Sequence, residues 1–273
     1  ESLKSNSIFT NVGKPPDGDV WWEDIDRPAP DLLIDWHGHE WVHYDAAHKA
    51  AHPNARFTAP AHQCPVIADS WEDPKGVKID AILFGGRRGT GQPLAMESFG
   101  WQHGTFLGST MASEKTAAAA GKVGELRFDP MAMLPFCGYH MADYWQHWLD
   151  MGAKGGDKMP KIFYVNWFRK GNDGHWLWPG FGENSRVLKW VCERCDDKVD
   201  AVDTPIGRLP VPGSLDLSGL DIPSDDLIAL FEVKNEDWLQ KVSVFREHYA
   251  KFGDKLPKEL AGELDALEAR LKA

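Results

Sequence analysis

Two apolar runs, each ending in polar and glycine-rich sequence, constrain the fold of this chain more than any other feature. The first run extends from Val77 to Phe84 and ends in Gly85-Gly86, and the second extends from Lys161 to Trp167. Short apolar runs bounded by turn residues are typical of buried strands, and paired glycines after a strand allow a tight loop. The sequence therefore predicts two buried strands, the first of which feeds a tight loop.

Helical patterns surround these strands. One predicted helix lies between Pro135 and Gly152, another extends from Glu183 to Cys195, and residues 224–273 form a predicted helical tail. The residues expected on inner faces are Met141, Tyr144, Trp145, Trp148 and Leu149 in the first helix and Val187, Leu188 and Val191 in the second. In the tail, Ser224 is expected to cap one helix, Asn235 to cap a second that stops at Gly253, and Pro257 to open a third. Residues 1–60 show only short strands in irregular sequence, so the predicted class is α/β, a mixed sheet with flanking helices and a helical tail.

Composition narrows the function classes. The 273 residues contain 30 Lys and Arg against 41 Asp and Glu, a net charge of −11, which argues against nucleic acid or an anionic membrane as the main partner. No apolar run approaches the roughly 20 residues of a membrane span, and no signal peptide opens the sequence. Four cysteines do not build a disulfide framework, so a reducing cytoplasm is the expected location. Because the first residue is Glu1 rather than Met, we expect a piece of a longer protein.

The first segment that carries chemistry is Phe84-Gly85-Gly86-Arg87-Arg88-Gly89-Thr90-Gly91. Glycines after a buried strand let the backbone approach a ligand closely, and two adjacent arginines offer fixed forks of N–H donors for phosphate or carboxylate. The segment is not a Walker loop, because no Gly-Lys-Ser/Thr follows it, and it lacks the dinucleotide fingerprint. On the residues alone, an anion site and a surface hairpin with solvated arginines are equally good interpretations.

A second candidate lies at Asn54-Ala55-Arg56, which follows His52-Pro53. Residues two positions apart on an extended segment project to the same side, so the Asn54 and Arg56 side chains could together hold a small dicarboxylate. Without further support, a structural turn is the better interpretation of this segment.

The sharpest signal is an aromatic cluster in glycine-rich sequence after the second predicted strand. Phe168, Trp176 and Phe181 lie in loops where they need not face a core, and stacking a base on such rings is worth about 1–3 kcal/mol per base. Asn184 carries both a donor and an acceptor and could read one edge of a purine. Rings beside glycine also pack core edges or bind sugar faces, and the residues alone do not separate base from sugar.

Histidine and cysteine clusters suggest no metal. The histidines between His37 and His52 match no common ligand spacing, and Cys192 and Cys195 form a lone C-x-x-C pair where a structural zinc needs a second pair.

Several long motifs together resemble the GTP-dependent phosphoenolpyruvate carboxykinase family. The resemblance extends from Thr10-Asn11-Val12 to the C-terminal helices and so covers essentially the whole chain. The motifs that carry it are Phe84–Arg88, Trp101-Gln102-His103-Gly104, Ser113-Glu114-Lys115-Thr116-Ala117-Ala118-Ala119, Asn166-Trp167-Phe168-Arg169 and Trp178-Pro179-Gly180-Phe181-Gly182-Glu183-Asn184-Ser185-Arg186.

The resemblance implies an enzyme that decarboxylates oxaloacetate and transfers the γ-phosphoryl of GTP to the resulting enolate, giving phosphoenolpyruvate, CO2 and GDP in gluconeogenesis or anaplerosis. By this resemblance Asn54 and Arg56 hold oxaloacetate or phosphoenolpyruvate, and Arg87 lies near the nucleotide phosphates. Arg56 and Arg87 are the expected catalytic residues. Residues 1–60 become a substrate-side segment, residues 160–190 the guanine pocket and residues 224–273 the helical tail. The guanine pocket would be formed by Phe168, Trp176, Phe181 and Asn184.

The resemblance also implies a mobile Ω-loop lid over residues 113–122, which would shield the enolate from protons. The chain departs from the family at the end of this lid, where Ala120-Gly121-Lys122 stand in place of the Glu-His of some relatives. It also departs in the pocket, where Trp176 stands at a position at which many relatives carry Phe. The expected lid residues are Ser113, Glu114, Thr116, Ala117, Ala118 and Gly121.

Other parts of the family's machinery are expected outside this chain. The phosphate-binding loop, a reactive cysteine and the Mn2+ ligands (a lysine, a histidine and an aspartate) belong to the preceding half of the family's proteins, so no metal ligand is expected here. The intact protein is expected to need Mn2+, with Mg2+ on the nucleotide, to be a monomer, and to contain the missing N-terminal half. The segment alone is expected to have no turnover. A carbohydrate-binding module and a catalytically inactive nucleotide-binding domain stay open as alternatives.

Overall fold

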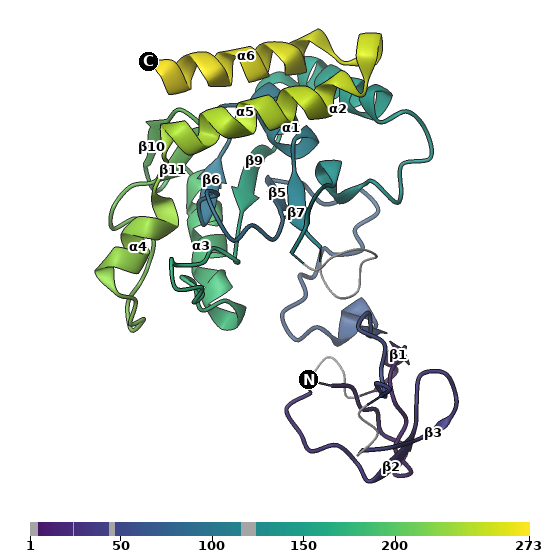
Figure 1. Ribbon diagram of the computed structural model, residues 1–273. Coiled ribbons are helices and arrows are strands. Elements are labelled where there is room, and N and C mark those ends of the chain that lie inside the picture. The colour runs from purple at the N-terminus through teal and green to yellow at the C-terminus, as the bar shows by residue number, and fades with distance from the viewer. Residues whose placement is uncertain (1–4, 24, 44–46, 116–123) are drawn as a thin grey trace. The chain divides into compact units, whose positions relative to one another are not determined.

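The computed structural model describes residues 5–23, 25–43, 47–115 and 124–273, and it divides the chain into two compact units (Figure 1). Unit 1 contains Glu1–Lys78 and Lys115–Val123, and unit 2 contains Ile79–Glu114 and Gly124–Ala273. In the part of the chain that the structure describes, every helix is too short or too polar to cross a membrane.

The described residues of unit 1 form four strands of three residues each around a small core. The antiparallel pairs are β1 with β4 and β2 with β3, with bounds Ile8–Thr10, Arg56–Thr58, Leu32–Ile34 and Glu40–Val42. The core consists of Trp21, Leu33, Trp41 and Ala50, and the Trp21 and Trp41 rings stack at 5.8 Å. The prediction of irregular sequence with short strands is confirmed for this unit.

Unit 2 contains a five-stranded sheet in the order β10-β11-β6-β9-β5. Only β5 and β9 are parallel to each other, and the remaining pairs are antiparallel, so the sheet is mixed as predicted. The strands are β5 (Ala81–Gly85), β6 (Ala95–Glu97), β9 (Lys161–Val165), β10 (Ala201–Thr204) and β11 (Gly207–Pro210). A separate antiparallel pair joins β7 (Ala112–Glu114) to β8 (Leu126–Phe128).

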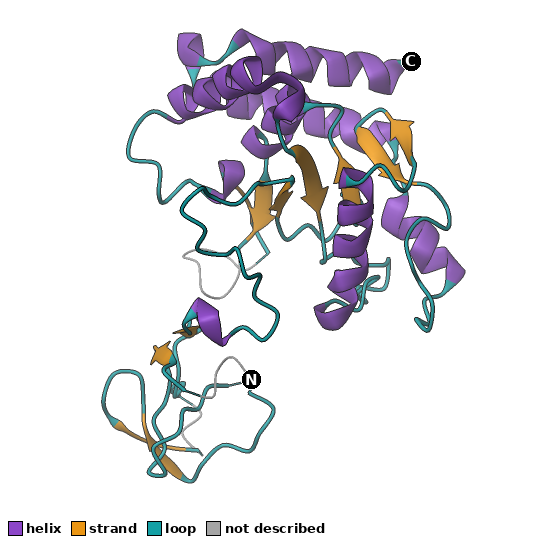
Figure 2. Ribbon diagram, turned by 180° about the vertical axis from the view of Figure 1, so that it is seen from behind, coloured by secondary structure: helices purple, strands orange, loops and turns teal. Residues whose placement is uncertain are grey.

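Strand β9 separates two hydrophobic cores because successive side chains of a strand point to opposite faces. Ile162 and Tyr164 belong to a core shared with helices α1, α2, α5 and α6, while Phe163 and Val165 belong to a core shared with helices α3 and α4. Figure 2 shows the helices on both sides of this sheet. The helices are α1 (Trp101–Ser109), α2 (Met141–Gly155), α3 (Asn184–Cys195), α4 (Ser224–Phe231), α5 (Asn235–Ala250) and α6 (Lys258–Lys272).

Two details of the predicted elements, the start of the first strand and one inner-face residue of α3, are wrong. The first strand begins at Ala81 rather than Val77, and Val77 is 58% exposed. Leu188 is 45% exposed, and Trp190 occupies the inner face of α3 in its place because helical spacing from Val187 falls on it. The predicted starts of the tail helices are confirmed.

Neither Ser224 nor Asn235 acts as the predicted side-chain cap. The side chains make no capping hydrogen bond at the start of α4 or α5. Asn235 Nδ2 instead donates to the carbonyl of Leu271 at 3.0 Å, which ties the start of α5 to the end of α6. The α5 helix ends at Ala250, so Gly253 lies just beyond it and begins a short 3-10 turn.

Candidate functional site

The candidate site of unit 2 lies where the parallel strands β5 and β9 end. Their carboxyl ends are paired through Gly85 and Val165, so the segments that follow each strand leave the sheet at the same edge. Crevices outside the carboxyl ends of parallel strands are the usual ligand sites of open α/β sheets. Residues 86–91, here called the arginine loop, follow β5, and residues 166–170 follow β9.

Asn166 joins these two segments. Its side chain is 1% exposed, and its Nδ2 donates to the carbonyls of Arg88 at 2.9 Å and Gln92 at 3.1 Å. Its Oδ1 accepts from the backbone N–H of Arg88 at 3.3 Å and of Phe168 at 3.2 Å. One buried amide therefore fixes the backbone on both sides of the site.

Strand β7 supplies a second set of anchors for the arginine loop. The N–H of Gly89 donates to Glu114 Oε1 at 2.7 Å, and the N–H of Arg87 donates to Ser113 Oγ at 3.0 Å. The N–H of Lys170 donates to the carbonyl of Gly89 at 2.8 Å. The loop is thus held in place before any ligand arrives.

Of the predicted lid residues, Ser113 and Glu114 lie in β7, where they make these anchoring bonds. The other four, Thr116, Ala117, Ala118 and Gly121, lie outside the described residues, as do Ala120 and Lys122. The lid itself stays a prediction.

The structure brings three of the predicted nucleotide-binding residues together. The Arg87 guanidinium carbon lies 4.2 Å from the centre of the Phe168 ring, and this ring meets Trp176 edge to face at 5.8 Å. Trp176 is 52% exposed, and Lys170 Nζ lies 4.3 Å from its ring. A cation over an aromatic face is favourable, so the Arg87 fork and the ring support each other. The Phe168 and Trp176 rings, which form what is here called the Phe168–Trp176 corner, are open to solvent on one side, unlike rings buried in a core.

Phe181 and Asn184 lie at the start of α3, on a segment separate from this corner. Phe181 is 95% exposed and has a φ of +47°, and in the described residues it makes no ring contact. Asn184 Oδ1 accepts from Trp178 Nε1 at 2.9 Å, and among the described residues its Nδ2 has no acceptor. Trp178 is 1% exposed, so Asn184 is fixed against a rigid neighbour with its donor end free.

A buried cation supports the arginine loop from behind. Lys241 of α5 donates from Nζ to the carbonyl of Gly91 at 2.7 Å and lies 3.9 Å from the Trp238 ring. Burial, followed by the nearby Arg88 and Arg169 charges, lowers the pKa of Lys241 to about 7. Burial also lowers the pKa of Arg169, which is 7% exposed. The loop is therefore backed by two basic side chains, Lys241 and Arg169, and Lys241 is the easier of the two to deprotonate.

Unit 1 carries the second predicted pair, Asn54 and Arg56. Arg56 Nε donates to Asn54 Oδ1 at 3.1 Å, so the two side chains do lie on the same side of the segment. The N–H of Asn54 donates to His52 Nδ1 at 2.9 Å, which leaves the other ring nitrogen of His52 as the N–H donor of the neutral imidazole.

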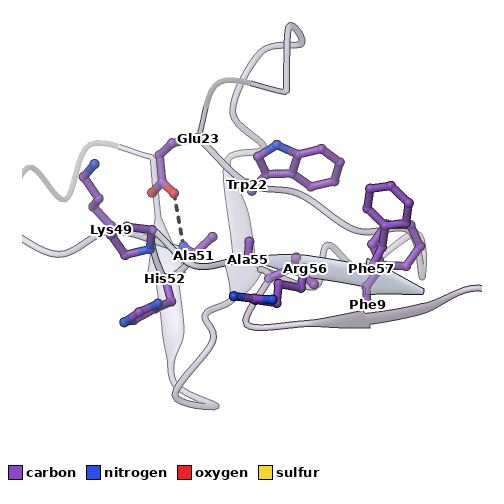
Figure 3. Close-up of a pocket in the computed structure, with 11 residues that line it drawn as sticks. Phe9, Trp22, Glu23, Lys49, Ala51, His52, Ala55, Arg56 and Phe57 are labelled. Carbon is purple, nitrogen blue, oxygen red and sulfur yellow. Dashed lines mark hydrogen bonds between the residues drawn. The ribbon is translucent and has the colours of Figure 1, made fainter. Parts of the chain in front are cut away.

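Arg56 lines a pocket of about 480 Å³ that lies wholly within unit 1 (Figure 3). Arg56, His52 and Lys49 supply the basic groups of its lining, and Phe9 and Phe57 form the other end. Among the described residues of the lining, the acidic one is Glu23. It accepts from the backbone N–H groups of Ala50 at 2.7 Å and Ala51 at 3.2 Å, so its charge is already engaged. A pocket with this balance suits a small anion.

No group of three His, Cys, Asp or Glu side chains is placed to hold a metal ion among the residues that the structure describes. Cys192 and Cys195 are free thiols on α3, and burial raises the pKa of Cys195. A higher pKa means less thiolate at neutral pH, so this thiol is a poor nucleophile or ligand.

Two residues of the site were given no role by the sequence. Asn166 could have been noticed as a polar residue directly after a buried strand. Lys241 gave no signal, because a basic residue in a helix usually points to solvent, and only the fold shows it under the arginine loop.

Comparisons with known proteins show the family of the chain. Residues 1–270 match the model of a family described as the phosphoenolpyruvate carboxykinase C-terminal P-loop domain. The chain is 52% identical over 279 residues to "Phosphoenolpyruvate carboxykinase [GTP]" of Treponema pallidum (strain Nichols), covering 99% of this chain and 45% of that protein. The proteins of the same name from Corynebacterium kroppenstedtii and Renibacterium salmoninarum are 52% and 51% identical, with 98% of this chain and 43% and 44% of theirs covered.

The chain thus spans less than half the length of these relatives. Although the family description names a P-loop, neither Gly-Lys pair of this sequence, at Gly13 and Gly121, is followed by Ser or Thr. With a family match over nearly its whole length, the chain belongs to the GTP-dependent phosphoenolpyruvate carboxykinase family and represents its C-terminal domain.

Proposed function

We propose that this chain supplies the guanine pocket, a phosphate-facing arginine and the keto acid arginine of a GTP-dependent phosphoenolpyruvate carboxykinase. In that reaction oxaloacetate loses one carboxylate as CO2, and the enolate oxygen takes the γ-phosphoryl of GTP to give phosphoenolpyruvate and GDP. One observation carries the proposal: Arg87, Phe168 and Trp176 meet at the carboxyl ends of β5 and β9, on backbone that is already anchored.

The guanine ring would stack on the open side of the Phe168–Trp176 corner. Asn184 sharpens the choice of base, because its Oδ1 is engaged by Trp178 and its Nδ2 can only donate. Guanine presents the O6 acceptor at the position where adenine presents an amino donor. A fixed N–H donor therefore accepts guanine and rejects adenine, and we assign this role to Asn184. Phe181 is proposed as a further wall, since a ring that is 95% exposed beside Asn184 is free to cover a base.

Arg87 would face the phosphates of the nucleotide. Its backbone is fixed by Ser113, and its guanidinium rests on Phe168. A preorganised fork can meet phosphoryl oxygens bidentately without being ordered at the moment of reaction, and arginines offset the charge that develops on a transferred phosphoryl group.

Asn54 and Arg56 would hold the keto acid in unit 1. Among the described residues, the Nε–Oδ1 bond leaves the two terminal nitrogens of Arg56 to pair with a carboxylate and leaves the Asn54 amide NH2 as a further donor. The basic lining of the pocket matches the two carboxylates of oxaloacetate.

The remaining parts of the proposal follow the family. Residues 113–122 would form the lid, and the intact protein would be a cytoplasmic monomer. As the family resemblance implies, we place the Mn2+ ligands and the phosphate-binding loop in the half of the relatives that this chain does not span, and we assign no step to a metal here.

Nucleotide binding by the 273-residue chain tests the guanine pocket. We expect GDP to quench tryptophan fluorescence and to bind at least about tenfold more tightly than ADP, a difference of about 1.4 kcal/mol. Binding of oligosaccharides with no response to GDP would favour a carbohydrate-binding module and overturn the proposal.

The variant Asn184→Ala tests the base-reading role. Loss of one hydrogen bond should reduce the GDP-to-ADP preference about tenfold, and because IDP keeps the O6 acceptor, IDP should lose affinity in parallel with GDP. Asn172→Ala, an exposed residue of the neighbouring turn, is the matched control and should change nothing. An unchanged base preference in Asn184→Ala would show that the edge-reading assignment is wrong.

Turnover tests the keto acid side. The chain alone, supplied with GTP, oxaloacetate and Mn2+, is expected to be inactive, and substantial turnover would show that no essential group is missing. In a chimera that joins the preceding part of the Treponema relative to this chain, Arg56→Ala should lower kcat/KM about a hundredfold by removing charge from the bound carboxylate. Unchanged catalysis in that variant would show that Arg56 has no catalytic role.

A further inference from the structure

A short turn delivers Trp176 to the proposed guanine pocket. Lys170 and Trp176 form an isolated antiparallel bridge, and residues 171–175 close the turn between them. The N–H of Gly171 donates to the carbonyl of His175 at 2.9 Å, and the N–H of Gly174, which has a φ of +88°, donates to the carbonyl of Gly171 at 3.0 Å. A displacement of His175 therefore also displaces the neighbouring Trp176.

His175 makes two contacts that a neutral imidazole cannot both satisfy. Its Nδ1 contacts Asp173 of the same turn, and its Nε2 lies 2.9 Å from Asp226 Oδ2 in the first turn of α4. Carboxylates only accept hydrogen bonds, and a neutral imidazole has a single N–H, so both contacts require the protonated ring. Hydrogen bonds to Asp226 and then Asp173 raise the pKa of His175.

The charged surroundings of His175 also favour the imidazolium. The ring lines a cavity of about 470 Å³ within unit 2, where acidic side chains outnumber basic ones. The charged residues of this lining are Arg169, Lys170, Asp173, Asp225, Asp226, Glu232, Lys234 and Asp237.

Asp226 is a fixed point for the turn. The α4 helix is anchored by Leu230, which is fully buried in the core shared with α3 and whose carbonyl accepts from the N–H of Leu94 at 3.0 Å. Of the contacts described for the turn, the His175–Asp226 bond is the one that joins it to α4.

We propose that protonated His175 is the positioning residue for Trp176, and that loss of its proton releases the turn from α4 and weakens guanine binding. The neutral ring keeps one of its two partners, so the wall formed by Trp176 loses its fixed orientation against Phe168. Nucleotide affinity then falls as pH rises through the titration of His175. This inference rests on the proposed guanine pocket.

The test measures GDP binding to the 273-residue chain by tryptophan fluorescence from about pH 6.5, the ordinary pKa of histidine, up to about pH 8.5, because the pKa of His175 is raised. For the unchanged chain we expect affinity to fall about three- to tenfold across this range. His175→Lys keeps a permanent cation and should bind tightly, without the fall in affinity that comes from His175. Titration of Lys241, whose pKa is about 7, contributes equally to the profile of every variant. His175→Gln should bind weakly at every pH.

Matched controls separate this effect from titration of the ligand and from damage to the fold. Asp226→Asn should lose the pH dependence, whereas Asp225→Asn, one residue away and without a described bond to His175, should keep it. His147→Gln removes an exposed histidine of α2 and should also keep the profile of the unchanged chain. Thermal melting confirms that each variant is folded.

The outcomes distinguish this inference from the function beneath it. If GDP binds with the same profile in the unchanged chain, His175→Lys and His175→Gln, the role of His175 is wrong and the guanine pocket stands. If no variant binds GDP at any pH, the pocket and the positioning role both fail.

Discussion

The proposed nucleotide site of unit 2 and the proposed keto acid site of unit 1 are each held in place by different means. In unit 2 the arginine loop is anchored by the buried Asn166 amide, by Glu114 of β7 and by Lys241, each through a hydrogen bond to the loop backbone. In unit 1 the Asn54–Arg56 pair lies on three-residue strands over a core of four residues, and Arg56 itself is exposed. The comparison indicates that the nucleotide side is preorganised, whereas the keto acid side depends on local contacts between exposed groups.

The largest expected effect is loss of unit 2 stability in acid. Burial lowers the pKa of His103 to about 3 and that of His248 to about 4, so both stay neutral in the fold while the unfolded chain takes up protons below about pH 6.5. The unfolded state then binds more protons, and stability falls by about 1.4 kcal/mol per pH unit for each histidine as pH drops. Denaturant unfolding at pH 7 and pH 5 should differ by roughly 3–4 kcal/mol.

The variant His248→Phe checks this assignment. His248 stacks on Phe128 at 3.9 Å, and a phenyl ring can keep that contact without titrating. The loss between pH 7 and pH 5 should shrink by about half. A loss of the same size in the variant would show that carboxylates, rather than buried histidines, set the acid limit.

Removing one side-chain amide in each unit tests most directly whether the two units differ in how firmly their sites are held. Asn166→Ala leaves two buried N–H and two carbonyl groups without their partner and should cost roughly 3 kcal/mol of unfolding free energy. Asn54→Ala removes one bond to the exposed Arg56 and should cost less than about 1 kcal/mol. Denaturant titration gives the totals, and hydrogen exchange assigns each loss to its unit. Equal losses would refute the contrast between the two parts.

The smallest expected effect concerns Lys241. Lys241→Met leaves the carbonyl of Gly91 without its donor and should weaken GDP binding about fivefold, or about 1 kcal/mol. Lys49→Met, in the pocket of unit 1, is the matched control and should leave GDP affinity unchanged. Because the unfolded chain keeps a lysine proton to about pH 10.5 and the folded chain only to about pH 7, the unchanged protein should gain stability relative to Lys241→Met as pH rises between these values. A parallel pH profile in the two proteins would contradict the buried position of this cation.

The sequence predicted the fold class, both strands of the parallel pair and most of the helices, because their apolar patterns are regular. It missed α1, which is buried on nearly all sides and contains Gly104 and Gly108, residues that argue against a helix. The structure explains these glycines, since a Cβ on Gly104 would lie 2.5 Å from Ile162 and one on Gly108 would lie 2.7 Å from Phe84. Close packing of a helix on the sheet leaves no periodic trace in the sequence.

The candidate site was predictable as a list of residues but not as an arrangement. Phe168 and Trp176 were expected together and do meet, but their edge-to-face contact and the placement of Arg87 over Phe168 depend on loop backbone that no pattern encodes. The paired glycines Gly85 and Gly86 at the end of β5 are also required for a reason that the sequence did not indicate. A Cβ on Gly85 would lie 2.8 Å from the carbonyl of Val165, and one on Gly86 would lie 2.9 Å from that of Ala112, so both serve packing between strands.

Strand β9 is a partition with a core on each side, and its last residue leads directly into Asn166. Because side chains pack against both faces of β9, a displacement of its carboxyl end cannot be absorbed by rearrangement on one face alone. A nucleotide that binds only at the carboxyl end of β9 should therefore slow amide hydrogen exchange in the helices on both faces of the sheet.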